Sequence, residues 1–125
     1  RRKNAEYFKS KMQRFEEIRI QKEIGESSWF GFALLLQGKL EGHRDEIVHA
    51  LRANGIETRP IVAGNFTRNK VIEYMDYSIP EKLAHADDIH FNGFFIGNHS
   101  SDNTKEIDYF IAVLEKAIKE SGIYE

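Results

Sequence analysis

The sequence lacks cysteine altogether and has only two prolines and one tryptophan in 125 residues. Without cysteine there can be neither a disulfide framework nor thiol chemistry. The longest apolar run, Phe32 to Leu36, is far shorter than the roughly 20 residues that a membrane-spanning helix needs. No secretory leader is visible at the N-terminus. We therefore expect a cytoplasmic protein that has no membrane partner.

An excess of charge of either sign is also missing. The 18 Lys and Arg residues and 20 Asp and Glu residues give a net charge of −2. Nucleic-acid-binding domains carry a basic surface that this balance does not supply, so we expect no nucleic-acid partner. With 41% hydrophobic and 30% charged residues, the chain has the composition of a globular domain. Its length suits a single domain over 1–125 that buries about two-thirds of the surface of the unfolded chain.

The spacing of apolar residues predicts an α/β domain. Helical periodicity indicates helices over 2–16, 45–54 and 103–121, with short helices at 71–75 and from Pro80 onward. Apolar and β-branched runs indicate strands at 18–20, 29–36, 56–62 and 93–96. Their interleaving predicts a two-layer α/β fold, in which helices flank a sheet of three or four strands.

Several of these boundaries have a local signal. Asn103 followed three residues later by Glu106 is the pattern of a capping box. Asn54 and Gly55 are expected to end a helix, because glycine adopts the left-handed conformation readily. Pro80 suits the first turn of a helix, where its missing N–H leaves no bond unmade.

The segment from Thr58 to Asn65 holds the strongest candidates for ligand contacts. Pro60 disfavours the α conformation for the residue before it, so Arg59 should project from an extended strand. Gly64 and Asn65 tolerate the positive φ of a sharp turn that exposes N–H groups and an amide side chain. A cation beside such donors suits an anionic or hydroxylated ligand. The same residue types also simply end strands.

A second Gly-Asn turn, at Gly97 and Asn98, follows another apolar strand. If the two strands are parallel neighbours, both turns open at one edge of the sheet, where α/β proteins tend to bind ligands. The N–H groups of each turn could then form an anion-binding nest. His99, beside the second turn, is either a ligand contact or a solvent-facing loop residue.

Other candidate residues have a structural explanation beside the functional one. His85, Asp88 and His90 suggest a metal cluster, but on a helix His90 lies well around from His85, which favours a polar surface and no metal site. Trp29 and Phe30 suit a core position, and either ring could also wall a pocket against a sugar or cofactor. No Ser-His-Asp set, P-loop or GxGxxG motif is present, so we expect no catalytic residue in this chain.

Four segments together resemble the C-terminal domain of the DegT-type nucleotide-sugar aminotransferases and dehydratases. They are Arg-Arg-Lys-Asn at 1–4, Ser-Trp-Phe-Gly-Phe at 28–32, Thr-Arg followed by Ala-Gly-Asn within 58–65, and Phe-Phe-Ile-Gly-Asn at 94–98. They occur in the family's order and extend over nearly the whole chain. The resemblance is strongest to the pyridoxamine-phosphate-dependent dehydratases, which remove the 3-hydroxyl group of a 4-keto-6-deoxy sugar nucleotide.

This resemblance implies the small C-terminal domain of the aspartate-aminotransferase fold, from a homodimeric enzyme of lipopolysaccharide and O-antigen sugar biosynthesis. The parent enzyme would use pyridoxamine 5'-phosphate or pyridoxal 5'-phosphate and a nucleotide-sugar substrate. In the family the catalytic base and cofactor phosphate site lie in the large domain. We therefore expect a fragment that lacks the upstream cofactor-binding domain, and the start at Arg1 without methionine agrees. Alone, the fragment should be inactive and bind neither form of the cofactor.

In this family the small domain closes over the substrate, and four positions are candidate contacts. Arg59 would pair with the nucleotide diphosphate or the cofactor, because a guanidinium binds phosphate oxygens bidentately. Asn65 would bond to sugar hydroxyls, and Trp29 and Asn98 would line the pocket. The segment 62–65 lacks the histidine usual in the aminotransferase branch, which favours dehydration. A fragment of a sugar-nucleotide aminotransferase and a free-standing, non-enzymatic binding or interaction module remain the alternatives.

Overall fold

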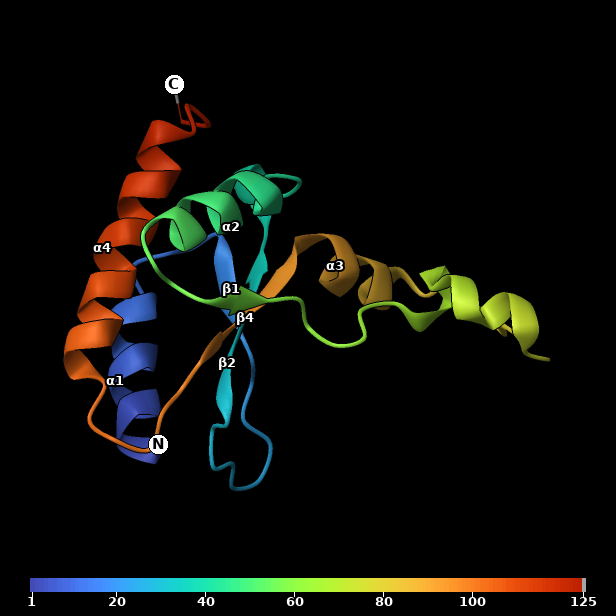
Figure 1. Cartoon of the computed structure of the whole chain (residues 1–125), viewed down its shortest axis with the longest axis horizontal. Coiled ribbons are helices and arrows are strands. Elements are labelled where there is room, and N and C mark those ends of the chain that lie inside the picture. The colour runs from blue at the N-terminus through green and yellow to red at the C-terminus, as the bar shows by residue number, and fades with distance from the viewer. Residues whose placement is uncertain (125) are drawn as a thin grey trace.

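The computed structural model describes residues 1–124, which form an antiparallel four-stranded sheet and the helices around it (Figure 1). The α-helices are α1 (Arg2–Met12), α2 (Arg44–Ala53), α3 (Ala84–Asn92) and α4 (Thr104–Glu120). The strands are β1 (Ile18–Ile20), β2 (Gly31–Leu36), β3 (Thr58–Arg59) and β4 (Gly93–Gly97), and they lie in the order β1-β2-β4-β3. Short 3₁₀ turns occur at η1 (Gly38–Leu40), η2 (Phe66–Arg68) and η3 (Lys70–Tyr74). The predicted α/β class and sheet of three or four strands are confirmed.

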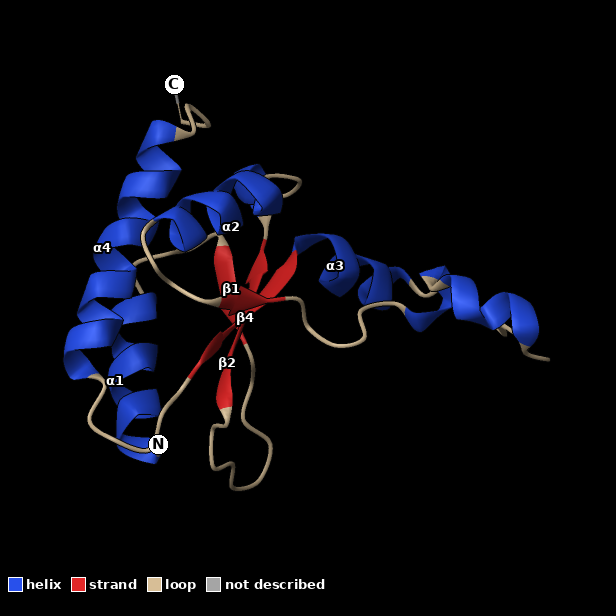
Figure 2. Ribbon diagram, in the orientation of Figure 1, coloured by secondary structure: helices blue, strands red, loops and turns tan. Residues whose placement is uncertain are grey.

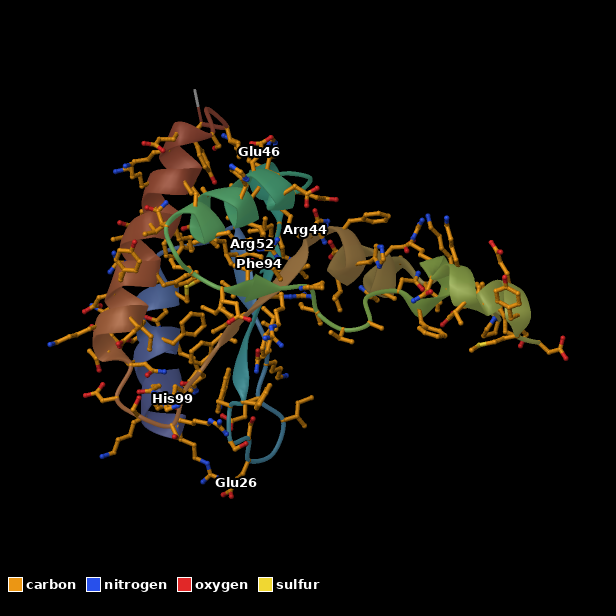
Figure 3. The ribbon with its side chains drawn as sticks, in the orientation of Figure 1. Glu26, Arg44, Glu46, Arg52, Phe94 and His99 are labelled. Atoms are coloured by element: carbon orange, nitrogen blue, oxygen red, sulfur yellow. The ribbon has the colours of Figure 1, made fainter. Side chains whose placement is uncertain are left out.

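The core lies between one face of the sheet and α1, α2 and α4. Along β2, every second side chain points to these helices, and Phe32 stacks on Phe8 of α1 with ring centroids 4.0 Å apart. Phe94 of β4, labelled in Figure 3, belongs to the same core and is 1% exposed. Burying a side chain of this size contributes about 1.5–3 kcal/mol. The helices α1 and α4 run side by side over this face (Figure 1).

The opposite face of the sheet is covered only in part. Its side chains come from the alternate positions, where Ala33 pairs with Phe95 and Leu35 pairs with Gly93. At one end α3 leads directly into Gly93, where an added Cβ would lie 2.5 Å from the carbonyl oxygen of Ile89 and 2.8 Å from Cδ1 of Ile61. Toward the other end, around Phe95, this face is open to solvent.

An arm made by residues 60–83 leaves the sheet after β3 and extends away from it before α3 begins (Figure 2). The turns η2 and η3 within it bury no residue. Their first N–H groups are capped by neighbouring amides, because Asn65 accepts from the N–H of Thr67 and Asn69 from that of Val71. Several large apolar side chains of the arm are exposed, namely Val62, Phe66, Val71, Tyr74, Met75, Tyr77 and Ile79.

Two predicted elements are shorter because turns begin inside the apolar pattern. The first helix ends at Met12 and not at residue 16, because the N–H of Phe15 bonds to the carbonyl of Met12 in a turn. Phe15 still packs on the core from that turn, which extends the helical spacing past the helix. The strand expected from residue 29 begins at Gly31. Trp29 has a φ of +51°, so it belongs to the turn before the strand.

The strand expected over 56–62 contains only Thr58 and Arg59. Pro60 has no N–H to donate to the ladder, so pairing stops before it. The helix expected from Pro80 begins at Ala84, where the carbonyl of Leu83 accepts the first helical bond from Asp87. The helix expected from residue 45 begins one residue earlier, at the start of α2.

The capping box predicted at Asn103 is wrong. Asn103 is the N-cap of α4, but its side chain makes no capping bond. The carboxylate of Asp102 accepts from the N–H of Thr104 at 3.0 Å, and the amide of Asn103 turns toward Asn98. The hydroxyl and N–H of Thr104 hold the pKa of Asp102 below its ordinary value.

Among the helices of residues 1–124, none combines the length and the apolar character of a membrane span.

Candidate functional site

A groove of about 690 Å³ opens at the edge of the sheet where β4 ends, β3 begins and α4 starts. Its walls include Arg59 of β3, Phe95 of β4, Phe30 before β2 and Tyr109 of α4. This volume lies within the roughly 300–1,000 Å³ of small-molecule sites. The groove combines aromatic walls with charged side chains at its rim, so it suits a ligand that has both a flat ring and an anionic group.

Arg59 stands on the open face of the sheet, paired in register with Phe95. Its Nη2 and Nε atoms donate to the Oε1 atom of Glu57 at 2.6 and 2.9 Å. Both side chains are more than 70% exposed. An exposed ion pair is worth at most about 1 kcal/mol, so the guanidinium remains available to a stronger anion. The prediction that Arg59 projects from extended backbone is confirmed.

Asn98 lies at the inner end of the groove, 4% exposed and fully engaged. Its Nδ2 atom donates to the main-chain oxygens of Trp29 at 2.8 Å and Arg1 at 3.1 Å. Its Oδ1 atom accepts from Nδ2 of Asn4 at 3.0 Å. The side chain thereby ties together α1, the turn before β2 and the loop after β4, where His99 lies beside α1 (Figure 3).

Trp29 is not a wall of the groove, because its side chain is 2% exposed and belongs to the core. The ammonium of Lys9 lies 5.4 Å from the centroid of its ring. Phe30, the next residue, points the other way and is 72% exposed in the groove. Alternation along extended backbone would place Phe30 on the same face as the buried Phe32, but the left-handed conformation of Trp29 reverses this, so the sequence alone does not separate the two residues.

Asn65 lies far from this groove, at the other end of β3. Because β3 and β4 are antiparallel, the Gly-Asn turns that follow them open at opposite ends of the sheet. The condition for both turns to open at one edge, parallel strands, is therefore not met, and the two turns do not form one site. The N–H of Asn65 donates to Nδ1 of His90 at 3.1 Å, and a Cβ on Gly64 would lie 2.5 Å from that same nitrogen. Asn65 thus fastens the arm to α3.

Asp87 is the charged centre of this contact between the arm and α3. It accepts from Nε of Arg68 at 2.5 Å, from Nη2 of Arg68 at 2.9 Å and from Nδ2 of Asn65 at 2.7 Å. These bonds to Arg68 and then to Asn65 hold the pKa of Asp87 well below its usual range. The guanidinium of Arg68 also lies 4.7 Å from the ring centroid of Phe91. No three His, Asp or Glu side chains in residues 1–124 come together as a metal site.

The groove offers little to hold the phosphate-bearing cofactor that the resemblance implies. Its permanent cations are the guanidiniums of Arg1 and Arg59, and no lysine lines it. An isolated exposed guanidinium suits a phosphate oxygen, whereas the groove has no amine that could bond covalently to an aldehyde. The residues therefore fit an anionic substrate group better than a resident cofactor. Glu57, Phe95 and Tyr109 are groove residues that sequence reasoning missed.

Two curated relatives match almost the whole chain. A GDP-4-keto-6-deoxy-D-mannose 3-dehydratase of Yersinia pseudotuberculosis is 45% identical over 117 residues, covering 93% of this chain and 30% of the relative. A protein of the same name from Escherichia coli O55:H7 is 43% identical over 116 residues, covering 92% of this chain and 30% of the relative. The chain therefore spans about a third of the length of these relatives.

A solved structure shares the fold at the same level of identity. The E. coli GDP-4-keto-6-deoxy-D-mannose-3-dehydratase with bound hydrated PLP superimposes with a TM-score of 0.85 and 43% identity, over 90% of this chain and 29% of that one. The match confirms the expected fold class, the small α/β domain of the aspartate-aminotransferase fold. The model of the DegT/DnrJ/EryC1/StrS aminotransferase family matches residues 1–115. The chain thus belongs to the DegT/DnrJ/EryC1/StrS aminotransferase family.

Proposed function

We propose that this chain is the small C-terminal domain of a pyridoxamine-phosphate-dependent dehydratase that acts on a 4-keto-6-deoxy sugar nucleotide. The observation that carries the proposal is the 43–45% identity over more than 90% of the chain to two 3-dehydratases of such a substrate. The TM-score of 0.85 to an E. coli dehydratase structure agrees with it at the level of the fold. The product would be a deoxy sugar of the kind used for lipopolysaccharide and O-antigen.

The proposal assigns the chemistry and the binding to different parts of the full-length protein. The cofactor would be held outside this chain, by the upstream large domain, and would supply an amine and an electron-withdrawing ring that make loss of the 3-hydroxyl group feasible. This chain would close over the substrate from one side. We further propose that the full-length protein is a cytoplasmic homodimer.

Among the residues of this chain, Arg59 is the proposed direct contact to substrate. Its exposed guanidinium is held by Glu57 alone, and a diphosphate carries more charge and more acceptor oxygens than one carboxylate. Asn98 and Trp29 would not contact substrate directly. The hydrogen bond between them would instead hold the floor of the groove and the turn that carries Phe30. Asn65 would act by placing the arm against α3.

The test is the activity of the full-length protein and of its Arg59→Ala variant on GDP-4-keto-6-deoxymannose. Loss of a charge-assisted hydrogen bond of about 1.5–3 kcal/mol should raise KM roughly 10- to 150-fold, with the fold intact by circular dichroism. Arg19→Ala is the matched control, since Arg19 stands on the same face of the sheet but outside the groove. Formation of a 4-amino sugar without loss of the 3-hydroxyl would instead identify an aminotransferase. Unchanged KM and kcat in Arg59→Ala would remove this residue from the site.

A further inference from the structure

Phe30 has an unusual position for a large apolar side chain. It lies directly before β2 and remains 72% exposed, although its neighbours Trp29 and Phe32 are buried. Its ring faces that of Phe95 at a centroid distance of 6.1 Å and an interplanar angle of 24°. The guanidinium of Arg1 lies 5.7 Å from the centroid of Phe30. The two rings thus form a stacked pair that still presents aromatic surface to the groove.

The backbone beneath this pair is shaped to receive it. A Cβ on Gly31 would lie 2.0 Å from Cζ of Phe95, so only glycine lets that ring lie against β2. Gly97, which pairs with Gly31, has nothing within 4 Å of the position of its absent Cβ. The ring of Phe95 therefore covers Gly31, and Gly97 beside it leaves an open shelf on the sheet next to the rings. A flat ring system could rest there without displacing a side chain.

A charged side chain, that of Arg59, lies beside this open part of the sheet. Arg59 is paired in register with Phe95, and its guanidinium is held only by the exposed carboxylate of Glu57. An aromatic surface that shares one groove with an available guanidinium matches a ligand that carries a base at one end and a diphosphate at the other. Nucleotide bases stack on aromatic side chains with little dependence on which base is bound. Phosphate oxygens pair with guanidinium groups.

From this arrangement we propose that Phe30 and Phe95 form the base-stacking platform of the nucleotide site, with the diphosphate paired to Arg59. The inference rests on the proposed function, in which the substrate is a sugar nucleotide, and it goes further by assigning the base to these two rings. Phe30 is the outer ring, so its free face would contact the base. Phe95 would support Phe30 from beneath and hold it at its angle.

The test is titration of the full-length protein with GDP, measured by isothermal calorimetry. Stacking on one aromatic side chain is worth roughly 1–3 kcal/mol, so Phe30→Ala should weaken GDP binding about 5- to 150-fold. Inorganic pyrophosphate has no base, and its affinity should not change in Phe30→Ala. Arg59→Ala should weaken both ligands. Phe30→Tyr keeps the ring and should bind GDP as the unaltered chain does.

Ile24→Ala is the control, because Ile24 is 89% exposed between β1 and β2 but does not line the groove. Equal GDP affinity in Phe30→Ala and Ile24→Ala would overturn the proposal, and so would the absence of GDP binding by the unaltered full-length protein at millimolar concentration. Either result would show that the two rings do not hold the base. The proposed dehydratase activity would survive such a failure, since it is measured separately as loss of the 3-hydroxyl group from the sugar nucleotide.

Discussion

Asn98 donates its side-chain amide to the main-chain oxygen of Trp29 across 2.8 Å, and neither side chain is more than 4% exposed. This bond joins the end of β4 to the turn before β2. Trp29 has the left-handed conformation there, with a φ of +51°, which is uncommon for a bulky residue. The bond therefore helps to hold the turn that sends the ring of Trp29 into the core and the ring of Phe30 into the groove.

Replacing Asn98 by alanine should lower the free energy of unfolding by about 2–3 kcal/mol, because buried groups left without a partner bear their full desolvation cost. The carbonyl of Trp29 would lose this bond, and the amide of Asn4 would keep only its bonds to the carbonyls of His99 and Ser101. Urea denaturation followed by the fluorescence of Trp29 measures the change. Asn69→Ala is the control, since Asn69 caps η3 in the exposed arm. A loss in Asn98→Ala no larger than in Asn69→Ala would show that the buried network contributes little.

Gly31→Ala and Gly97→Ala are a matched pair of changes at one register position of the sheet. At Gly31 the new methyl group would meet Phe95 at 2.0 Å and the carbonyl oxygen of Ile96 at 2.7 Å, whereas at Gly97 it would point into open space. Overpacking of this kind costs about 1–3 kcal/mol, so Gly31→Ala should be destabilised by that amount. Gly97→Ala should stay within about 0.5 kcal/mol of the unaltered chain. Thermal unfolding measures the stability of both variants. Equal stabilities would contradict the described position of Phe95.

Asp87→Asn should destabilise the protein at neutral pH but not in acid. In the folded state the bonds from Arg68 and Asn65 keep the pKa of Asp87 far below the value of about 3.9 in the unfolded chain. The unfolded chain therefore takes up the proton first, so the contribution of Asp87 is complete above about pH 5 and is lost as the pH falls through about 4 and below. The stability gap between the two proteins should be constant from pH 7 to about pH 5 and narrow below about pH 4.

Urea denaturation at a series of pH values tests this dependence. Asp76→Asn provides the control, because Asp76 is exposed in the loop between η3 and α3. A gap that stayed constant down to pH 2 would show that the ion pair of Asp87 and Arg68 does not persist in solution.

The helices and strands with long buried stripes were predictable from apolar spacing, whereas the length of β3 was not, because its pairing stops at Pro60. The 3.6-residue spacing of α4 and the apolar run of β2 indicate their elements correctly. Strand direction was not predictable, since the sequence of β3 and β4 does not say whether their ends coincide. The capping box failed for a similar reason. The side chain of Asn103 donates to Oδ1 of Asn98 and so belongs to a tertiary network, which the capping-box pattern does not reveal.

The candidate site was predictable where a backbone rule applied and unpredictable where a side-chain direction decided. Proline after Arg59 predicts an extended residue, and the guanidinium does project into the groove. Whether Trp29 or Phe30 faces the groove depends on the positive φ of Trp29, and no neighbouring residue type indicates that conformation. Asn65 and Asn98 share a Gly-Asn motif but serve separate networks at opposite ends of the sheet.

The 125-residue chain should retain neither pyridoxal phosphate nor pyridoxamine phosphate after dialysis. Its groove presents two exposed guanidiniums and no lysine, so it provides neither a covalent attachment nor the several convergent donors that hold a phosphate group tightly. Absorbance spectra of the dialysed chain and of the full-length protein, each incubated with either cofactor, measure retention. The cofactor band should persist in the full-length protein and vanish from the short chain. A band that persists in the short chain, and that disappears in Arg59→Ala, would place the cofactor phosphate in this groove and would displace the diphosphate from it.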